Sequence, residues 1–417
     1  MRRALPAGTA LVSIARYSPL APPGPDRAAA PERYVAFVTR PETPRVTCVP
    51  LGAAAGLDSL VHRWIALAGR APSPLRRAAD ERACREAGAR VRERLWDPLA
   101  RELPGVERVL VVPDGAVAFV PWAALPLRDG RRLVESDVVL HQVAMERDVL
   151  DFARARDSGS GLLAFGGVDY GARGAPPGAG RSRGEGTDST ARGTPCTSLA
   201  ELRFAALPGS AAEVEAIHAL WTGSGEAGGA AVRTGAAADE RALRELAPGR
   251  RVLHLATHGF FLERACAAAG DEHGDPLCRS GIVLAGAGAT GADSGRADGI
   301  VTAAEIAGFD LSGVEWAVLS ACRTGLGDLE ANEGVLGLRR ALRIAGVSTV
   351  ITSLWEVDDQ AVRAWMQELY RARLERGLDT AAAMRAAART VLQARRAAGL
   401  GDHPREWAAF VAAGDWR

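Results

Sequence analysis

Two short apolar segments, each ending in a reactive side chain close to a glycine, constrain the fold of this chain most. They read RVLHLATHGF at 251–260 and WAVLSACRTG at 316–325. Both runs are too short and too continuously apolar for surface helices, so we expect strands buried on both faces of a parallel sheet. His258 then follows the C-terminal end of one strand, and Cys322 follows that of the other. Ligands of open α/β sheets bind outside these ends, so the pair predicts a Cys/His nucleophilic site.

Composition excludes several classes of function. The 417 residues are 47% hydrophobic, which is enough for a large core and suggests two or three folding units. A formal net charge of +1 gives no global field that would favour nucleic acid or a membrane. The chain has no lysine, so it can form neither a Walker-A phosphate loop nor a pyridoxal Schiff base. We therefore expect no cofactor.

Cysteine usage and hydropathy predict a cytoplasmic protein. Six cysteines are scattered through the chain without a dense disulfide framework, which is typical of a reducing compartment. The N-terminus begins Met-Arg-Arg but has no uninterrupted apolar core of a signal peptide. No stretch approaches the length of apolar sequence that spans a bilayer.

The pattern of apolar residues predicts an α/β fold in two parts. Residues 1–155 form a first α/β region, and residues 156–417 form a second with a β-α-β-α-β rhythm and a parallel sheet. Gly, Ser, Pro and Arg dominate about 170–200 and 263–299, which we expect to be mobile loops. Asp114-Gly115 predicts a hairpin turn into a strand at 116–120. Ser210, with Glu213 three residues later, predicts the N-cap of a helix ending at Trp221.

Other potential ligands are less informative. Cys266, His273 and Cys278 are three candidates at irregular spacing, against the four ligands of a structural zinc site, so we expect no metal. His254 shares a strand face with His258 by period two. It would therefore line the site and contact substrate, or else be a hydrogen-bonded histidine of the core.

Glycines support a nucleophilic site. Gly259, directly after His258, lets a substrate backbone approach and exposes an amide. The backbone amides of Gly259 and Cys322 could hold the oxyanion that forms at a scissile carbonyl. A nearby imidazolium and a helix N-terminus would both favour the Cys322 thiolate.

Several motifs in a fixed order resemble the CHAT domain, a family of caspase-like bacterial cysteine peptidases related to separases. The resemblance covers nearly the whole chain. The motifs are HLATHGFF at 254–261, DGIVTAAEI at 298–306, VLSACRTG at 318–325, NEGV at 332–335 and SLWEVDD at 353–359, with VVPDG at 111–115, PW at 121–122 and PREWAAF at 404–410.

The resemblance implies a caspase-hemoglobinase fold, with a mostly parallel sheet flanked by helices and a pseudo-caspase-like N-terminal half. It implies His258 as general base and Cys322 as nucleophile of a cysteine endopeptidase. It also implies limited proteolysis of a protein partner, such as a gasdermin-like pro-protein, in anti-phage defence or regulated cell death. An activating sensor or partner chain would switch the enzyme on.

Two further features concern the substrate. Relatives usually carry an acidic or polar residue after the nucleophile, where this chain has Arg323. That cation would favour the thiolate but repel a basic substrate. Asp358 and Asp359 stand where separase-like relatives place an acid for a basic P1 side chain, and Asp358 is also a good N-cap for the next helix.

The rival hypothesis is a catalytically silent interaction module that keeps the fold and uses the crevice for binding. The intact His-Gly and Ala-Cys segments favour the enzyme, because a binding module has no need of both.

Overall fold

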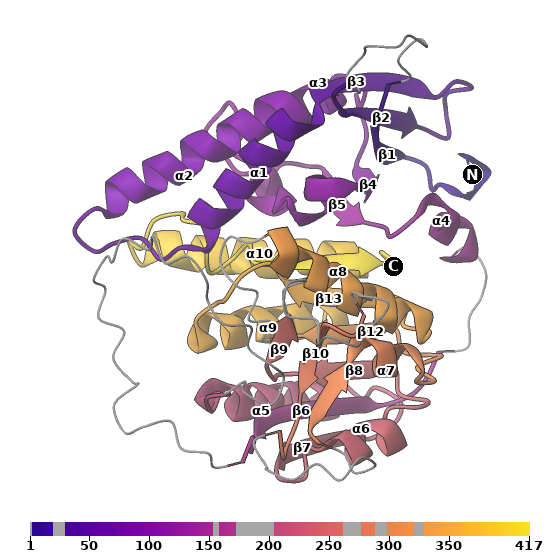
Figure 1. The fold of residues 1–417 in the computed structure, drawn as a ribbon, viewed down its shortest axis with the longest axis vertical. Coiled ribbons are helices and arrows are strands. Elements are labelled where there is room, and N and C mark those ends of the chain that lie inside the picture. The colour runs from indigo at the N-terminus through magenta and orange to yellow at the C-terminus, as the bar shows by residue number, and fades with distance from the viewer. Residues whose placement is uncertain are drawn as a thin grey trace.

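The computed structural model describes residues 2–19, 30–152, 158–171, 204–261, 277–287, 298–320 and 329–417, with the backbone alone described for 329–335. These residues form one large sheet of eleven strands and a small sheet of three, with helices packed on both faces (Figure 1). The predicted α/β architecture is confirmed.

The N-terminal part of the chain supplies one half of the large sheet. In spatial order its strands are β3 (Thr47–Ala53), β2 (Arg33–Thr39), β1 (Thr9–Tyr17), β4 (Arg108–Val112) and β5 (Val139–Gln142). Strand β2 is antiparallel to both β3 and β1, and β1, β4 and β5 run parallel. Strand β4, which reads Arg-Val-Leu-Val-Val, is buried along almost its whole length, as a continuous run of β-branched and aliphatic residues predicts.

The second half of the large sheet contains both apolar segments singled out in the sequence. Its spatial order is β14 (Phe410–Gly414), β13 (Thr349–Ser353), β12 (Trp316–Leu319), β8 (Val252–Leu255), β6 (Leu162–Val168) and β7 (Ala230–Gly235). All these neighbours are parallel except β13 and β14. Strands β8 and β12 are adjacent, with Trp316 opposite Val252, and every residue in them is buried. The prediction of two buried parallel strands is confirmed.

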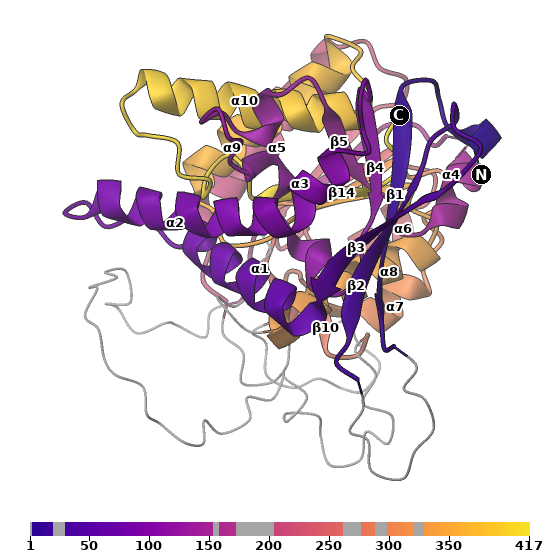
Figure 2. The ribbon, with the colours of Figure 1, turned by 90° about the horizontal axis from the view of Figure 1, so that it is seen from above.

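Helices cover the two faces of the large sheet unequally. One face carries six helices of the described structure, and the other carries four helices and the small sheet of β9 (Gly259–Phe261), β10 (Ser280–Val283) and β11 (Ile300–Thr302) (Figure 2). The first group is α1 (Ala54–Gly69), α2 (Arg77–Val91), α3 (Asp97–Ala100), α5 (Pro208–Gly223), α9 (Asp359–Leu374) and α10 (Thr380–Ala397). The second is α4 (Glu146–Phe152), α6 (Glu240–Leu246), α7 (Ala303–Ala307) and α8 (Leu329–Ile344).

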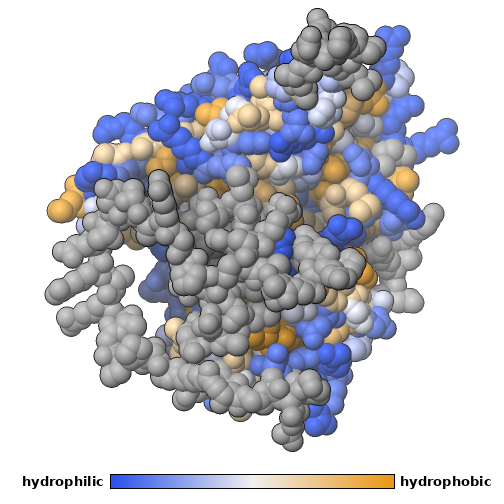
Figure 3. All heavy atoms as spheres, viewed as in Figure 1, coloured by the Kyte–Doolittle hydropathy of each residue, from blue (hydrophilic) through white to orange (hydrophobic). Residues whose placement is uncertain are grey.

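Hydrophilic residues occupy much of the coloured surface in the space-filling view, and hydrophobic colour falls in smaller patches between them (Figure 3). Within the described ranges, no helix has both the length and the apolar character needed to cross a bilayer.

Two local predictions were wrong. Residues Gly115–Phe119 form a 3-10 turn and not a strand, because the Asp114 side chain accepts a hydrogen bond from the Gly115 amide and tightens the chain there. Helix α5 starts at Pro208, two residues before Ser210, since proline needs no hydrogen-bond acceptor in a first turn. Ser210 instead binds Leu207 and Gly167 through its hydroxyl, and Glu213 is not part of a capping box.

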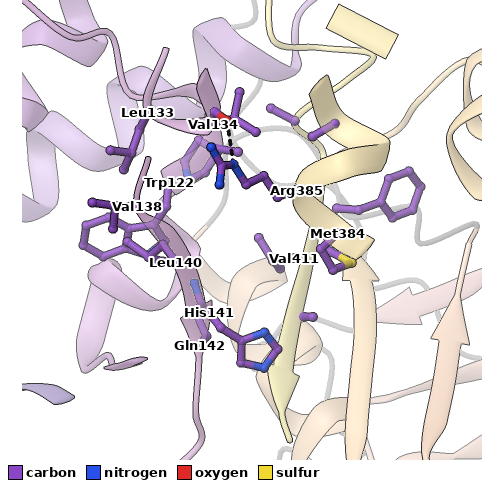
Figure 4. Close-up of a pocket in the computed structure, with 16 residues that line it drawn as sticks. Trp122, Leu133, Val134, Val138, Leu140, His141, Gln142, Met384, Arg385 and Val411 are labelled. Carbon is purple, nitrogen blue, oxygen red and sulfur yellow. Dashed lines mark hydrogen bonds between the residues drawn. The ribbon is translucent and has the colours of Figure 1, made fainter. Parts of the chain in front are cut away.

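The two halves of the large sheet meet at a narrow seam between β5 and β14. A single register pair, Gln142 with Ala413, joins these strands. A cavity of about 80 Å³ lies beside the seam, and Arg385 of α10 crosses its rim to donate to the carbonyl oxygen of Val134 at 3.1 Å (Figure 4). Nearby, the Arg132 guanidinium is 1% exposed and lies 3.0 Å from a carboxylate oxygen of Asp402. Side-chain contacts therefore join the two halves beside this single register pair.

The predicted boundary at residue 155 falls within 153–157, outside the described residues, so the division into 1–155 and 156–417 stays a prediction. Much of the two predicted mobile loops also lies outside them, although 277–287 is described and includes β10.

Candidate functional site

The chain leaves β8 through Ala256 and Thr257 and brings His258 to the edge of the sheet. The Ala256 amide still donates to Phe165 of β6, at 2.8 Å. The carbonyl oxygen of His258 then accepts from the Val283 amide of β10, at 2.9 Å. The imidazole is 6% exposed. Hydrogen bonds to both sheets thus fix the backbone that carries the candidate base.

Two aromatic rings pack against the His258 imidazole. The centroid of Tyr170 lies 5.0 Å from that of His258, and the centroid of Phe204 lies at 5.6 Å. The Thr257 hydroxyl donates to the Val283 carbonyl, so the Tyr170 hydroxyl, 2.9 Å away, is the donor to Thr257. Burial raises the pKa of Tyr170, which therefore keeps the proton that it donates.

A backbone carbonyl sets the tautomer of His258. Its Nε2 lies 2.7 Å from the carbonyl oxygen of Ala205, in the segment that precedes α5. A carbonyl oxygen only accepts hydrogen bonds, so Nε2 carries the proton. In the neutral ring, Nδ1 is then the nitrogen that can act as a base.

Strand β12 brings the chain to the same edge. The amide of Ser320, directly after β12, donates to the carbonyl oxygen of Leu255 at 3.1 Å, so residue 320 lies beside the end of β8. The Ser320 hydroxyl is buried, and its Oγ has no hydrogen-bond partner in the described structure. Cys322 and Arg323 follow within 321–328, outside the described residues, so the predicted nucleophile and its cation are not placed.

A cavity of about 320 Å³ opens beside His258 and Ser320. Three carboxylates line it: Glu213 of α5, Glu356 after β13 and Asp359 at the start of α9. No arginine is among its lining residues in the described part of the chain. The cavity is therefore suited to a positively charged group. Its lining also includes Ala205, Ala206, Leu207, Pro208, Ser210, Ser353, Val357 and Val362.

The two predicted acids of the substrate pocket point to different places. Asp358 is the N-cap of α9, and its side chain accepts from the Gln360 and Ala361 amides. It lines an outer groove and is not among the lining residues of the His258 cavity. Asp359 does line that cavity, and it accepts from the Gly209 amide at 2.9 Å.

His254, the other predicted contact, lies in the core. It is fully buried, and its two ring nitrogens contact Tyr370 and Glu213. It is not among the residues that line the cavity, but its partner Glu213 is. Gly259 begins β9 directly beside His258, opposite Ile282. The second amide of the predicted oxyanion site belongs to Cys322, outside the described residues.

Sequence reasoning missed the residues that surround His258. Tyr170, Phe204 and Ala205 flank the segment that was expected to be a mobile loop, so nothing in the pattern assigned them a role. Glu356 belongs to the SLWEVDD motif but was not singled out. Among the described residues, no group of three or more His, Cys, Asp or Glu side chains is arranged to hold a metal ion.

The sequence profile of the CHAT domain matches residues 85–415, which is most of the chain. This chain belongs to the CHAT domain family. The match includes β8, β12 and every residue that lines the cavity beside His258. No curated protein sequence matches this CHAT protein closely enough to count as a relative.

Solved structures resemble the CHAT protein in fold. The separase of the Saccharomyces cerevisiae separase–securin complex matches with a TM-score of 0.52 and 8% identity, over 98% of this chain and 30% of the separase chain. This chain therefore spans under a third of that protein's length. The Arg-specific cysteine proteinase gingipain R matches with a TM-score of 0.43 and 9% identity, over 87% of this chain and 74% of gingipain. The separase match shows a shared fold, which is a mixed α/β fold with a large, mostly parallel sheet flanked by helices.

Proposed function

We propose that this protein is a cysteine endopeptidase in which Cys322 is the nucleophile and His258 the general base. The observation that carries the proposal is the position of His258. Its imidazole stands beside a cavity at the tip of β8, with Nε2 tied to Ala205, while the adjacent strand β12 leads toward Cys322. With Nε2 protonated, Nδ1 is the ring nitrogen that would take the thiol proton.

The reaction then follows acyl transfer. Cys322 loses its proton to His258, and the thiolate attacks the scissile carbonyl carbon. The amides of Gly259 and Cys322 hold the oxyanion of the tetrahedral intermediate. As the C–N bond breaks, the imidazolium returns its proton to the leaving amine. Water, deprotonated by His258, hydrolyses the thioester and frees the thiol.

The cavity supports a basic residue at P1, the position before the scissile bond. Asp359 is the predicted specificity acid that lines it, whereas Asp358 serves the helix. A carboxylate pairs with a guanidinium through charge-assisted hydrogen bonds. We therefore assign the P1 contact to Asp359, and Arg323 remains a candidate contact on the strength of the sequence alone.

The biological setting follows from the family resemblance. We propose that the enzyme makes a limited cut in a protein partner, such as a gasdermin-like pro-protein, after activation by a sensor or partner chain, in bacterial defence or regulated cell death. Cys48 and Cys84 are free thiols, which favours action in a reducing cytoplasm.

Labelling with a peptidyl electrophile that carries arginine at P1 tests the enzyme directly. The wild-type protein should be labelled at Cys322, and Cys322→Ala should abolish labelling. His258→Ala should slow labelling strongly, because the base is lost. Labelling that persists in Cys322→Ala would refute the assignment. A protein that keeps its fold but neither labels nor cleaves a peptide library would instead support the interaction module.

A further inference from the structure

Three buried polar side chains, linked by two hydrogen bonds, lead from the core to the candidate cavity. The Tyr370 hydroxyl of α9 lies 3.1 Å from Nδ1 of His254 in β8, and Nε2 of His254 lies 2.9 Å from a carboxylate oxygen of Glu213 in α5. Their exposed fractions are 1%, 0% and 4%. Two of the three elements joined in this way, α5 and α9, line the cavity, and His258, three residues after the end of β8, lines it too.

The chemistry of the three side chains indicates which atoms donate these hydrogen bonds. Burial and the charge of Glu213 raise the pKa of Tyr370 well above its usual range, so the hydroxyl keeps its proton. A carboxylate accepts, so His254 donates to Glu213 through Nε2, and in the neutral ring Nδ1 would accept from Tyr370. This contact ties one oxygen of the Glu213 carboxylate to the core.

Glu213 retains capacity for a ligand. A carboxylate can accept about four hydrogen bonds, and within the described residues the one given to Glu213 comes from His254. Burying a carboxylate that accepts a single hydrogen bond is costly unless something else compensates it. Glu213 lines a cavity whose other ionised side chains are the acids Glu356 and Asp359. A cation in this cavity would supply the missing compensation.

The three acids of the cavity differ in how deeply their side chains are buried. Glu356 is exposed, Asp359 is partly exposed, and Glu213 is almost fully buried. The apolar side chains of Leu207, Val357 and Val362 line the same cavity and can cover an aliphatic stem. This arrangement suits a long side chain with an apolar stem and a cationic head.

We propose that Glu213 is a specificity residue that binds the guanidinium of a substrate arginine at the floor of the cavity, with His254 and Tyr370 as its positioning residues. The proposal rests on the proposed peptidase function and extends it to a particular acid. Arginine is favoured over lysine because its planar fork can meet Glu213 and Asp359 together, whereas an ammonium acts as a point charge.

Glu213→Gln tests the charge while keeping an acceptor for His254. The ratio of kcat/KM for an arginine peptide to that for the matched citrulline peptide should fall by roughly 10-fold or more, as expected for loss of a charge-assisted hydrogen bond. Glu215→Gln, the same change at an exposed position of α5, should leave the ratio at the wild-type value. Tyr370→Phe should lower the ratio less, because it loosens Glu213 without removing its charge. An equal loss on both peptides in Glu213→Gln would indicate a purely structural role and overturn the proposal.

Binding of benzamidine, an amidinium probe, gives a readout that needs no catalysis. Calorimetry should detect it on the Cys322→Ala protein and find at least about 10-fold weaker binding when Glu213→Gln is added. Unchanged binding in the double variant would refute the role of Glu213, whether or not the protein cleaves peptides. Binding that depends on Glu213 in a protein that never labels at Cys322 would retain the cation site and reject the peptidase.

Discussion

The carbonyl oxygen of Ala205 lies 2.7 Å from Nε2 of His258, so a segment 53 residues earlier in the chain fixes the tautomer of the candidate base. The neighbouring Phe204 ring packs on the same imidazole. The residues that precede α5 therefore belong to the candidate site as much as the strand that carries the histidine.

Phe204→Ala should slow alkylation of Cys322 by iodoacetamide about 2- to 10-fold near neutral pH, because a pair of packed rings contributes about 0.5–1.5 kcal/mol to the orientation of the imidazole. The rate would be measured from pH 5 to 9. Phe37→Ala, at a 40% exposed position of β2, is the matched control. Equal rates for the two variants would mean that Phe204 does not orient His258.

Asp358→Asn and Asp359→Asn should separate helix capping from substrate binding. Asparagine caps helices as well as aspartate, so the first variant should keep wild-type stability and activity, while Asp358→Ala should lower the free energy of unfolding by about 1 kcal/mol. Asp359→Asn should reduce kcat/KM for arginine peptides about 10-fold or more, through loss of a charged partner. Thermal unfolding and peptide kinetics measure both effects. The opposite pattern would place the P1 contact on Asp358.

Lowering the pH should reduce the free energy of unfolding, because Asp402 loses its charge at the seam between the two halves of the sheet. Burial alone would raise the pKa of this carboxyl, but the hydrogen bonds and charges of Arg132 and Arg85 lower it to about 2. The folded-state pKa thus lies below the ordinary value of 3.8, so this stabilisation is complete above about pH 4 and is lost as pH falls toward 2. Denaturant titrations between about pH 4 and 2 measure the slope of the free energy of unfolding against pH.

Asp402→Asn should remove that slope. It should also cost about 3–5 kcal/mol at neutral pH, because Arg132 is left buried without its counter-charge. Asp137→Asn, at an exposed position nearby, is the control. A slope that survives in Asp402→Asn would assign the acid sensitivity to other carboxylates.

A second loss of stability should occur at milder acidity. Burial lowers the pKa of His141 to about 4, and its Nε2 bonds the Gly414 carbonyl oxygen across the seam. The folded protein holds His141 neutral while the unfolded chain protonates near 6.5, so stability falls as pH drops from about 6.5 to 4. The full contribution is about 3 kcal/mol.

His141→Gln keeps a donor near the Gly414 carbonyl and cannot titrate, so it should flatten the fall in stability between pH 6.5 and 4. His403, whose pKa burial likewise lowers to about 4, should account for the part that remains. A pH dependence identical to that of the wild type would show that His141 does not titrate on unfolding.

Local patterns predicted the framework of the site because the physical signals there are local. Continuous apolar runs with few polar residues identified β8 and β12, and their adjacency followed from the parallel-sheet rule. Asp358 was recognised as a possible N-cap because its side chain can reach the amides two and three residues later. Such features depend on a few consecutive residues.

The residues that surround the cavity were harder to predict because their positions depend on long-range contacts. Glu213 was assigned to a capping box, yet Pro208 starts the helix earlier, and the Glu213 carboxylate instead contacts His254, 41 residues away. Phe204 and Ala205 border a stretch of low-complexity composition that gives no periodic signal. Only the assembled sheet and helices bring these residues to His258.

Strand β14 lies between β5 and β13, yet it is the last of the described strands to be synthesised. On the ribosome, the centre of the sheet therefore stays open until residues 410–414 have emerged. The strand edges of β5 and β13 have no neighbour at that position during this interval and must be protected from pairing with other chains. The emergence of β14 thus sets the moment at which the two halves of the sheet can join.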